Sequence, residues 1–145
     1  MTRSSFPQHR RHDLALGVVT LLESRYHHYL DYAGLLLPPE EVQRAVHSAA
    51  VQATSCWQTA LAAPDATAAT WTIVRVVLVA RARPQALASL ARLTASQQDV
   101  VLMRHALGWS DATIITVTGT DRCALAAASR ALARIAVPEA IPTVP

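Results

Sequence analysis

The stretch 90–135, which reads LARLTASQQDVVLMRHALGWSDATIITVTGTDRCALAAASRALARI, decides the fold. Two glycines, Gly108 and Gly119, divide it. Gly108 suits a left-handed helix terminus, and Ser110 is a natural N-cap for the helix that follows. Asp121 is placed to cap the last helix, which prolines beyond Ile135 prevent from continuing. Together with residues 85–89, which come just before it, this stretch predicts helices over 85–93, 96–107, 110–117 and 122–135.

The chain before this stretch is also predicted to be helical. Asp13 can cap a long amphipathic helix that ends before Pro38 and whose apolar face comprises Leu14, Val18, Leu21, Leu22, Tyr29, Ala33 and Leu36. A second helix begins at Pro38, because proline and the acids Glu40 and Glu41 suit a first turn. Its expected buried face comprises Val42, Ala45, Val46, Ala49, Ala53, Trp57, Ala60 and Leu61.

Two segments favour strands on propensity alone. The stretch 70–80, TWTIVRVVLVA, and the stretch 114–118 are rich in β-branched residues. Short apolar runs do not distinguish a strand from a buried helix. The sequence therefore predicts an all-α fold and leaves an α/β fold open as the minority alternative.

The composition gives few functional signals. The net charge is +3 and all 13 basic residues are arginine, but they are scattered along the chain and do not form one basic cluster. Cys56 and Cys123 are too few for a disulfide framework or a metal knuckle, so we expect free thiols. The length of 145 residues suits one compact domain or two small helical lobes.

The first residues resemble an export leader, because three arginines precede the apolar run 14–22. The run 23–26, ESRY, stands where such a leader has small residues at its cleavage site. No stretch approaches the roughly 18 apolar residues of a membrane-spanning helix. We therefore expect a cytoplasmic protein without a membrane partner.

The stretch 90–135 resembles region 4 of the extracytoplasmic-function sigma factors of RNA polymerase, a sigma-70 type family. The matching positions are Leu93, Gln97, Gln98, 100–104, Gly108, Ser110, Ile114, Gly119 and 130–135. The first half is similar to region 2 at 26–33 (YHHYLDYA), 57–61 (WQTAL) and Trp71. The resemblance implies a compact helical bundle of two sigma-like lobes: a three-helix region 2-like lobe at 13–83 and a region 4-like helix-turn-helix lobe at 84–137, followed by a Pro-rich tail at 138–145.

Three departures from the family pattern imply a degenerate member. Where the family carries an acidic, glutamine-bearing grip on the polymerase, residues 45–50 read AVHSAA. Where it presents an Arg-Asn pair to the opened promoter, 76–79 read VVLV, which favours burial. The helix expected in the major groove begins with 124–128, ALAAA, and alanine has no group that can donate to a base edge. Binding to the polymerase core is therefore doubtful.

The link between the predicted lobes is short. Sigma lobes must reach promoter elements separated by about 17 base pairs, or roughly 58 Å. Only about six residues lie between Arg81 and Leu87, and fully extended they span roughly 21 Å. Simultaneous contact with both elements is therefore not expected, and two lobes packed against each other are favoured.

Histidine and tryptophan residues supply the candidates for ligand or acid/base chemistry. His27 and Asp31 lie one helical turn apart, although a solvated helix face explains them as well. Trp57 and Trp71 could line a pocket or pack in the core. No metal-ligand spacing is present, so we expect neither metal nor cofactor. The candidate acid/base or ligand-pocket residues are His27, His28, Asp31, Trp57, Trp71 and His105.

Three functions stay open. The leading hypothesis is a sigma-like regulatory protein that does not initiate transcription alone and acts through contacts with a protein such as an anti-sigma factor. The second is a helix-turn-helix regulator whose Arg122, Arg130 and Arg134 bind DNA phosphates weakly, either as a monomer or as a homodimer. The third is a fold that binds or transforms a small apolar molecule between the lobes. Catalytic signatures are missing, which favours a non-enzymatic role.

Overall fold

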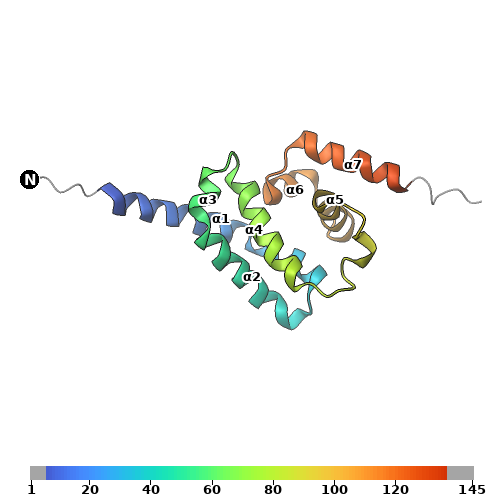
Figure 1. Ribbon diagram of the computed structural model, residues 1–145, viewed down its shortest axis with the longest axis horizontal. Helices are drawn as coiled ribbons and strands as arrows, with labels where there is room; N and C mark the ends of the chain where they lie inside the picture. Colours follow the sequence, from blue (N-terminus) through green and yellow to red (C-terminus); the bar gives the residue numbers. More distant parts are fainter. Residues whose placement is uncertain (1–5, 137–145) are drawn as a thin grey trace, which may run out of the picture.

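The computed structural model describes residues 6–136, and their side chains from 16 to 135 (Figure 1). These residues form seven α-helices and no strand, which confirms the all-α prediction and excludes strands at 70–80 and 114–118. The predicted Pro-rich tail, 138–145, lies outside the described residues. The helices are α1 (Phe6–Leu36), α2 (Pro39–Ser55), α3 (Trp57–Ala62), α4 (Ala66–Arg81), α5 (Ala95–Val100), α6 (Asp111–Thr118) and α7 (Arg122–Ala136), with a 3-10 turn η1 (Ala88–Leu90) and a π-helical turn η2 (Val101–Ala106).

The core is built mainly from α1, α2 and α4. Helix α2 packs along α4, and its small residues Ala45, Ala49 and Ala53 are fully buried in that contact. Small side chains let two helix backbones approach closely, so the large residues of α1 and α4 fill the remaining space. The largest fully buried side chains of this core are Val18, Tyr29, Tyr32, Leu36, Leu37, Val46, Val74 and Leu78.

The helix predicted to continue from Pro38 to Leu61 is interrupted. Helix α2 ends at Ser55, Cys56 leaves helical geometry with φ −97° and ψ 9°, and α3 continues from Trp57. The change of direction buries Trp57 and Ala60, as the apolar pattern predicts. It leaves Leu61 39% exposed, so the prediction that Leu61 is buried is wrong.

Helix α4 forms despite its β-branched residues. The Asp65 carboxylate caps it by accepting a hydrogen bond from the Ala68 N–H (3.1 Å), and Trp71, Val74 and Leu78 bury one face. The free energy gained by burying apolar residues at helical spacing outweighs the modest preference of the β-branched residues for a strand. Val76 points away from this core and is 61% exposed, contrary to the expectation that the run 76–79 is buried.

The caps predicted in the C-terminal half are present. The Thr113 N–H donates to the Ser110 hydroxyl (3.2 Å), and the Ala124 N–H donates to the Asp121 carboxylate (2.7 Å). Gly108 and Gly119 both have positive φ, 68° and 69°, as expected of left-handed helix ends.

Two helices predicted here differ in the structure. The segment 96–107 is α-helical only to Val100 and then widens into the π-helical η2. The segment 85–93 contains turns and η1 instead of an α-helix. The Gln98 amide donates to the carbonyls of Leu90 (2.9 Å) and Leu93 (3.3 Å), a tertiary contact from outside the segment that no local pattern predicts.

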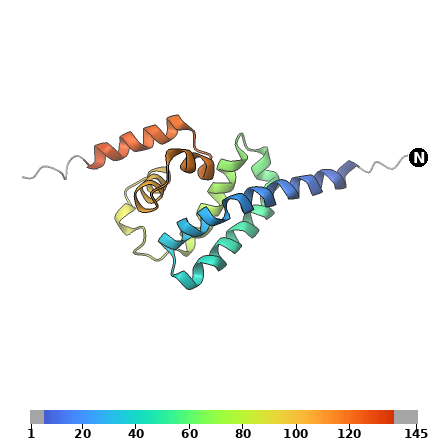
Figure 2. The same cartoon turned by 180° about the vertical axis from the view of Figure 1, so that it is seen from behind.

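Helix α1 begins at Phe6, so Asp13 lies within the helix and is not its N-cap; the Asp13 side chain is outside the described residues. The first turns of α1 project from the bundle, and α7 extends towards the opposite end (Figures 1 and 2). Of the helices described, none combines the length and apolarity that crossing a membrane requires.

We predict that Gly119→Ala destabilises the protein more than Gly108→Ala. Both residues have positive φ, which costs an alanine about 1–2 kcal/mol. A Cβ at Gly119 would also lie 2.5 Å from the Ala68 backbone nitrogen, whereas one at Gly108 meets open space. Overpacking adds about 1–3 kcal/mol. Urea unfolding followed by circular dichroism measures both; equal losses would contradict the close approach of α4 to the α6–α7 turn.

Candidate functional site

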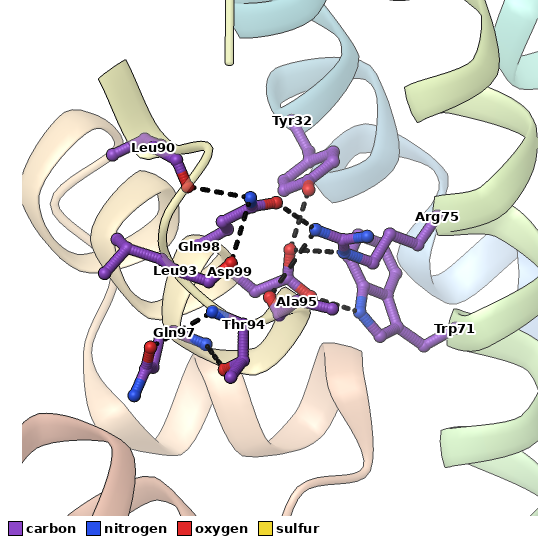
Figure 3. A network of polar contacts seen from close by, with 10 residues as sticks. All are labelled: Tyr32, Trp71, Arg75, Leu90, Leu93, Thr94, Ala95, Gln97, Gln98 and Asp99. Atoms are coloured by element: carbon purple, nitrogen blue, oxygen red, sulfur yellow. Dashed lines mark hydrogen bonds and ion pairs between the residues drawn. The ribbon is translucent and has the colours of Figure 1, made fainter. Parts of the chain in front are cut away.

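A buried carboxylate, that of Asp99, joins the two halves of the chain (Figure 3). Asp99 lies on α5 and is only 7% exposed. Its Oδ1 accepts hydrogen bonds from the Tyr32 hydroxyl on α1 (2.7 Å) and from Arg75 Nε on α4 (2.8 Å). Its Oδ2 accepts one from Trp71 Nε1 (3.0 Å). We call these four residues the Asp99 clamp, because three of them belong to the N-terminal half (6–81) and one to the C-terminal half (95–136).

Gln98 extends the clamp into the connection between the halves. Arg75 Nη2 donates to Gln98 Oε1 (2.8 Å) and approaches the Ala95 carbonyl (3.5 Å). The other end of the Gln98 side chain holds the two carbonyls of the connection, those of Leu90 and Leu93. At the start of α5, Thr94 and Gln97 form a reciprocal capping box. Through Gln98 and Arg75, the connection is therefore linked to the same buried carboxylate, that of Asp99, that α1 and α4 contact.

The electrostatics of the clamp keep the Tyr32 phenol protonated and the Arg75 guanidinium charged. Burial raises the pKa of Tyr32 well above its usual range, and the Asp99 charge and hydrogen bond raise it further, so the phenol stays a donor. Burial is the largest single influence on the pKa of Arg75 and lowers it, but the charge and hydrogen bond of Asp99, together with Tyr32, outweigh burial, and the net shift is upward. A buried ion pair is stable only when its remaining hydrogen-bonding groups are satisfied, and Tyr32 and Trp71 satisfy the carboxylate.

Further contacts between the halves surround the clamp. Arg25 Nε on α1 donates to the Thr116 carbonyl on α6 (2.8 Å). The rings of His28 and Trp109 meet edge to face with centroids 4.9 Å apart. Trp109 is half-buried and packs on the core.

The candidate histidines His27 and His28 are neighbours on α1, with ring centroids 3.9 Å apart. His27 and Asp31 are exposed, while His28 is half-buried with an Nδ1 that has no hydrogen-bond partner among the described residues. Burial lowers the pKa of His28, and the neighbouring His27 lowers it further. In the described part of the chain, no group of three or more His, Cys, Asp or Glu side chains is placed to hold a metal ion.

The other candidate pocket residues lie apart from one another. Trp71, which belongs to the clamp, also lines a cleft between the halves. Trp57 is buried elsewhere, facing Gly17, and its Nε1 has no partner among the described residues. His105 is exposed and lines an open groove between η2 and α7. The structure therefore does not bring Trp57, Trp71 and His105 together around one ligand.

Helix α7 carries the three candidate DNA-binding arginines. Arg122, Arg130 and Arg134 are exposed, and none makes an ion pair with an acid in the described residues. Arg104 of η2, in contrast, is held internally: it donates to the Ser129 hydroxyl on α7 (2.7 Å) and pairs with Asp111 on α6. Arg104 thus fixes the position of α7, and Arg122 and Arg130 border a shallow groove beside it.

The largest groove described lies between the connection, η2 and α7, with a volume of about 800 Å³. It combines an apolar surface from Leu93, Leu132 and Ile135 with basic side chains, and it has no acidic lining residue. Ile135 is 55% exposed. Its basic residues are Arg92, Arg104 and His105.

Comparison with known proteins gives no match: no family model, curated protein or solved structure is similar to this chain. Function is therefore inferred from the residues themselves. Sequence reasoning missed Asp99, Arg75 and Tyr32. The available signal was weak and concerned Arg75 alone, an arginine flanked by valines next to a run that favours burial.

We predict that Asp99→Ala destabilises the protein by about 3–5 kcal/mol, because it removes the carboxylate that pairs with the half-buried Arg75 and leaves the Tyr32 and Trp71 donors unsatisfied. Asp111→Ala is the matched control. It also removes a carboxylate from an arginine, but the Asp111 side chain is 65% exposed, so the loss should stay within about 1 kcal/mol. Both are measured by urea unfolding with tryptophan fluorescence. Similar losses for the two variants would mean that Asp99 has no special role.

Proposed function

We propose that this chain is a sigma-factor-like regulatory protein that acts through protein contacts in transcription control and is not an autonomous initiation factor. The Asp99 clamp is the observation that carries the proposal. A sigma factor in action needs its two DNA-reading parts apart. Here a buried charge with partners on α1 and α4 holds the corresponding halves together.

The C-terminal half supports the sigma-like part of the proposal. Helices α6 and α7 are joined by a short turn in which Gly119 is left-handed and Asp121 caps the next helix. A short turn containing glycine is typical of a helix-turn-helix. Helix α7 buries only Leu125 fully, so most of its surface faces outwards, as the second helix of such a motif does.

The connection between the halves supports the non-initiating part of the proposal. It runs over 82–94, longer than the sequence indicates, because 85–93 does not form an α-helix. Fully extended, these residues would span about 45 Å, still short of the roughly 58 Å between promoter elements. Extension would also break the hydrogen bonds of Gln98 to Leu90 and Leu93.

The polymerase-gripping segment of the family has no counterpart on the surface here. At the aligned positions, Ala45, Val46 and Ala49 are fully buried against the core. Buried alanine and valine offer a partner neither charge nor amide. Contact with the polymerase core by this route is therefore not part of the proposed function.

The basic groove between η2 and α7 is the surface that we assign to a regulatory partner such as an anti-sigma factor. Its apolar floor and its unbalanced positive charge, from Arg92 and Arg104, complement an acidic partner segment with apolar side chains. Arg104 is partly neutralised by Asp111, so Arg92 carries most of the exposed charge.

The test is a binary complex reconstituted from this chain and the regulator that co-purifies with it from the cells of origin. We predict that Arg92→Glu/His105→Glu weakens the complex at least tenfold by calorimetry, because charge reversal at the groove opposes an acidic partner. Arg44→Glu, an exposed reversal on α2, should leave it unchanged. Promoter-specific initiation by the purified chain with core polymerase would overturn the proposal.

DNA binding is the second candidate, favoured by one observation: Arg122, Arg130 and Arg134 are exposed and are not paired with an acid in the described residues. With three phosphate contacts, the logarithm of the binding constant would fall with the logarithm of the salt concentration at a slope of about −3 at most. On this candidate, Arg130→Glu/Arg134→Glu abolishes binding to random-sequence duplex at low salt. Anisotropy titrations measure it, and binding unaffected by the double reversal would remove the candidate.

A further inference from the structure

A second cleft, distinct from the basic groove, lies between the two halves beside the Asp99 clamp. Its volume is about 360 Å³, and it is more enclosed than the basic groove. Helix α4 forms one wall, α5 another, and the α6–α7 turn with the start of α7 the third. Its size lies within the ~300–1,000 Å³ of small-molecule sites, and location between two structural units is common for them.

The floor of the cleft is apolar and the walls are made of small residues. Trp71, Val100, Ile114 and Leu125 form the floor and are buried. The space exists because the positions that face it carry short side chains. These are Ala68, Ala95, Ala124 and Ala128. A single leucine at one of these positions would occupy much of the volume.

Polar groups are placed at defined points of the cleft. Arg75 lines it, and its Nη1 makes no hydrogen bond with a described residue, while Nε and Nη2 are held by the clamp (Figure 3). The hydroxyls of Ser96 and Thr120 also line the cleft and are likewise without a partner in the described residues. These groups can donate hydrogen bonds to an oxygen atom.

The charge of the cleft is balanced. The only charged lining residues are Arg75 and Asp99, which neutralise each other at 2.8 Å. A charged ligand would therefore lose its hydration in the cleft without meeting a net charge of opposite sign. An uncharged molecule has little hydration free energy to lose on entering. An entering helix, roughly 10 Å in diameter, is too large for this volume.

We infer that this cleft binds a small, uncharged, mainly apolar molecule that carries a carbonyl or hydroxyl oxygen, with its apolar body on Trp71 and Leu125 and its oxygen towards Arg75. The inference goes beyond the proposed function, because the cleft and the basic groove share no lining residue. A molecule held by both halves binds only their closed arrangement and stabilises it by mass action.

The test uses prodan, an uncharged naphthalene fluorophore that carries a ketone, with the full-length protein. We predict saturable binding at one site per chain with a blue-shifted emission, and a rise in melting temperature with prodan concentration. Ala124→Leu fills the cleft from an exposed position and should weaken binding at least tenfold. Ala128→Leu repeats the test from a half-buried position.

The matched control is Ala127→Leu, which adds the same side chain to α7 at an exposed position that lines no cleft described here. Its affinity for prodan should equal that of the unmodified protein. Absence of saturable binding, or binding that Ala124→Leu leaves unchanged, would overturn the inference. Neither result bears on the partner complex, whose groove contains neither alanine.

Discussion

The structure depends on how one buried negative charge is satisfied. Asp99 is 7% exposed, and a carboxylate removed from water destabilises the fold unless donors replace the lost solvent. Its donors come from α1 and α4, so α5 keeps its charge satisfied only when it lies against both helices. Apolar packing alone would tolerate several relative positions of the two halves. The directional hydrogen bonds of Tyr32, Trp71 and Arg75 select one.

The rest of the C-terminal half follows from this contact. With α5 fixed, η2 brings Arg104 to Ser129 and Asp111, which sets α7. Gly119 then allows the α6–α7 turn to approach the Ala68 backbone. The basic groove is bordered by the connection, η2 and α7, and the cleft between the halves by α4, α5, α6 and α7. The position of α7 therefore shapes both of them.

Sequence reasoning could predict features that depend on local interactions. The caps at Ser110 and Asp121, the left-handed Gly108 and the all-α class each follow from a few neighbouring residues. The α-helix predicted over 85–93 is wrong: the segment forms turns and η1, and Gln98, which lies outside it, binds the carbonyls of Leu90 and Leu93. The clamp itself links residues 24 and 67 positions apart, so no local pattern reveals it. Asp99 in particular carries no sequence signal that separates it from a surface acid.

The alanines of α7 have two opposite consequences. Alanine has no donor for a base edge, so Ala124 and Ala128 deprive the helix of direct readout. The same short side chains leave open the cleft beside Leu125 and Trp71, which longer side chains would fill. Because the clamp holds α5 against α4, the length of these side chains sets how much of the space between the halves stays open.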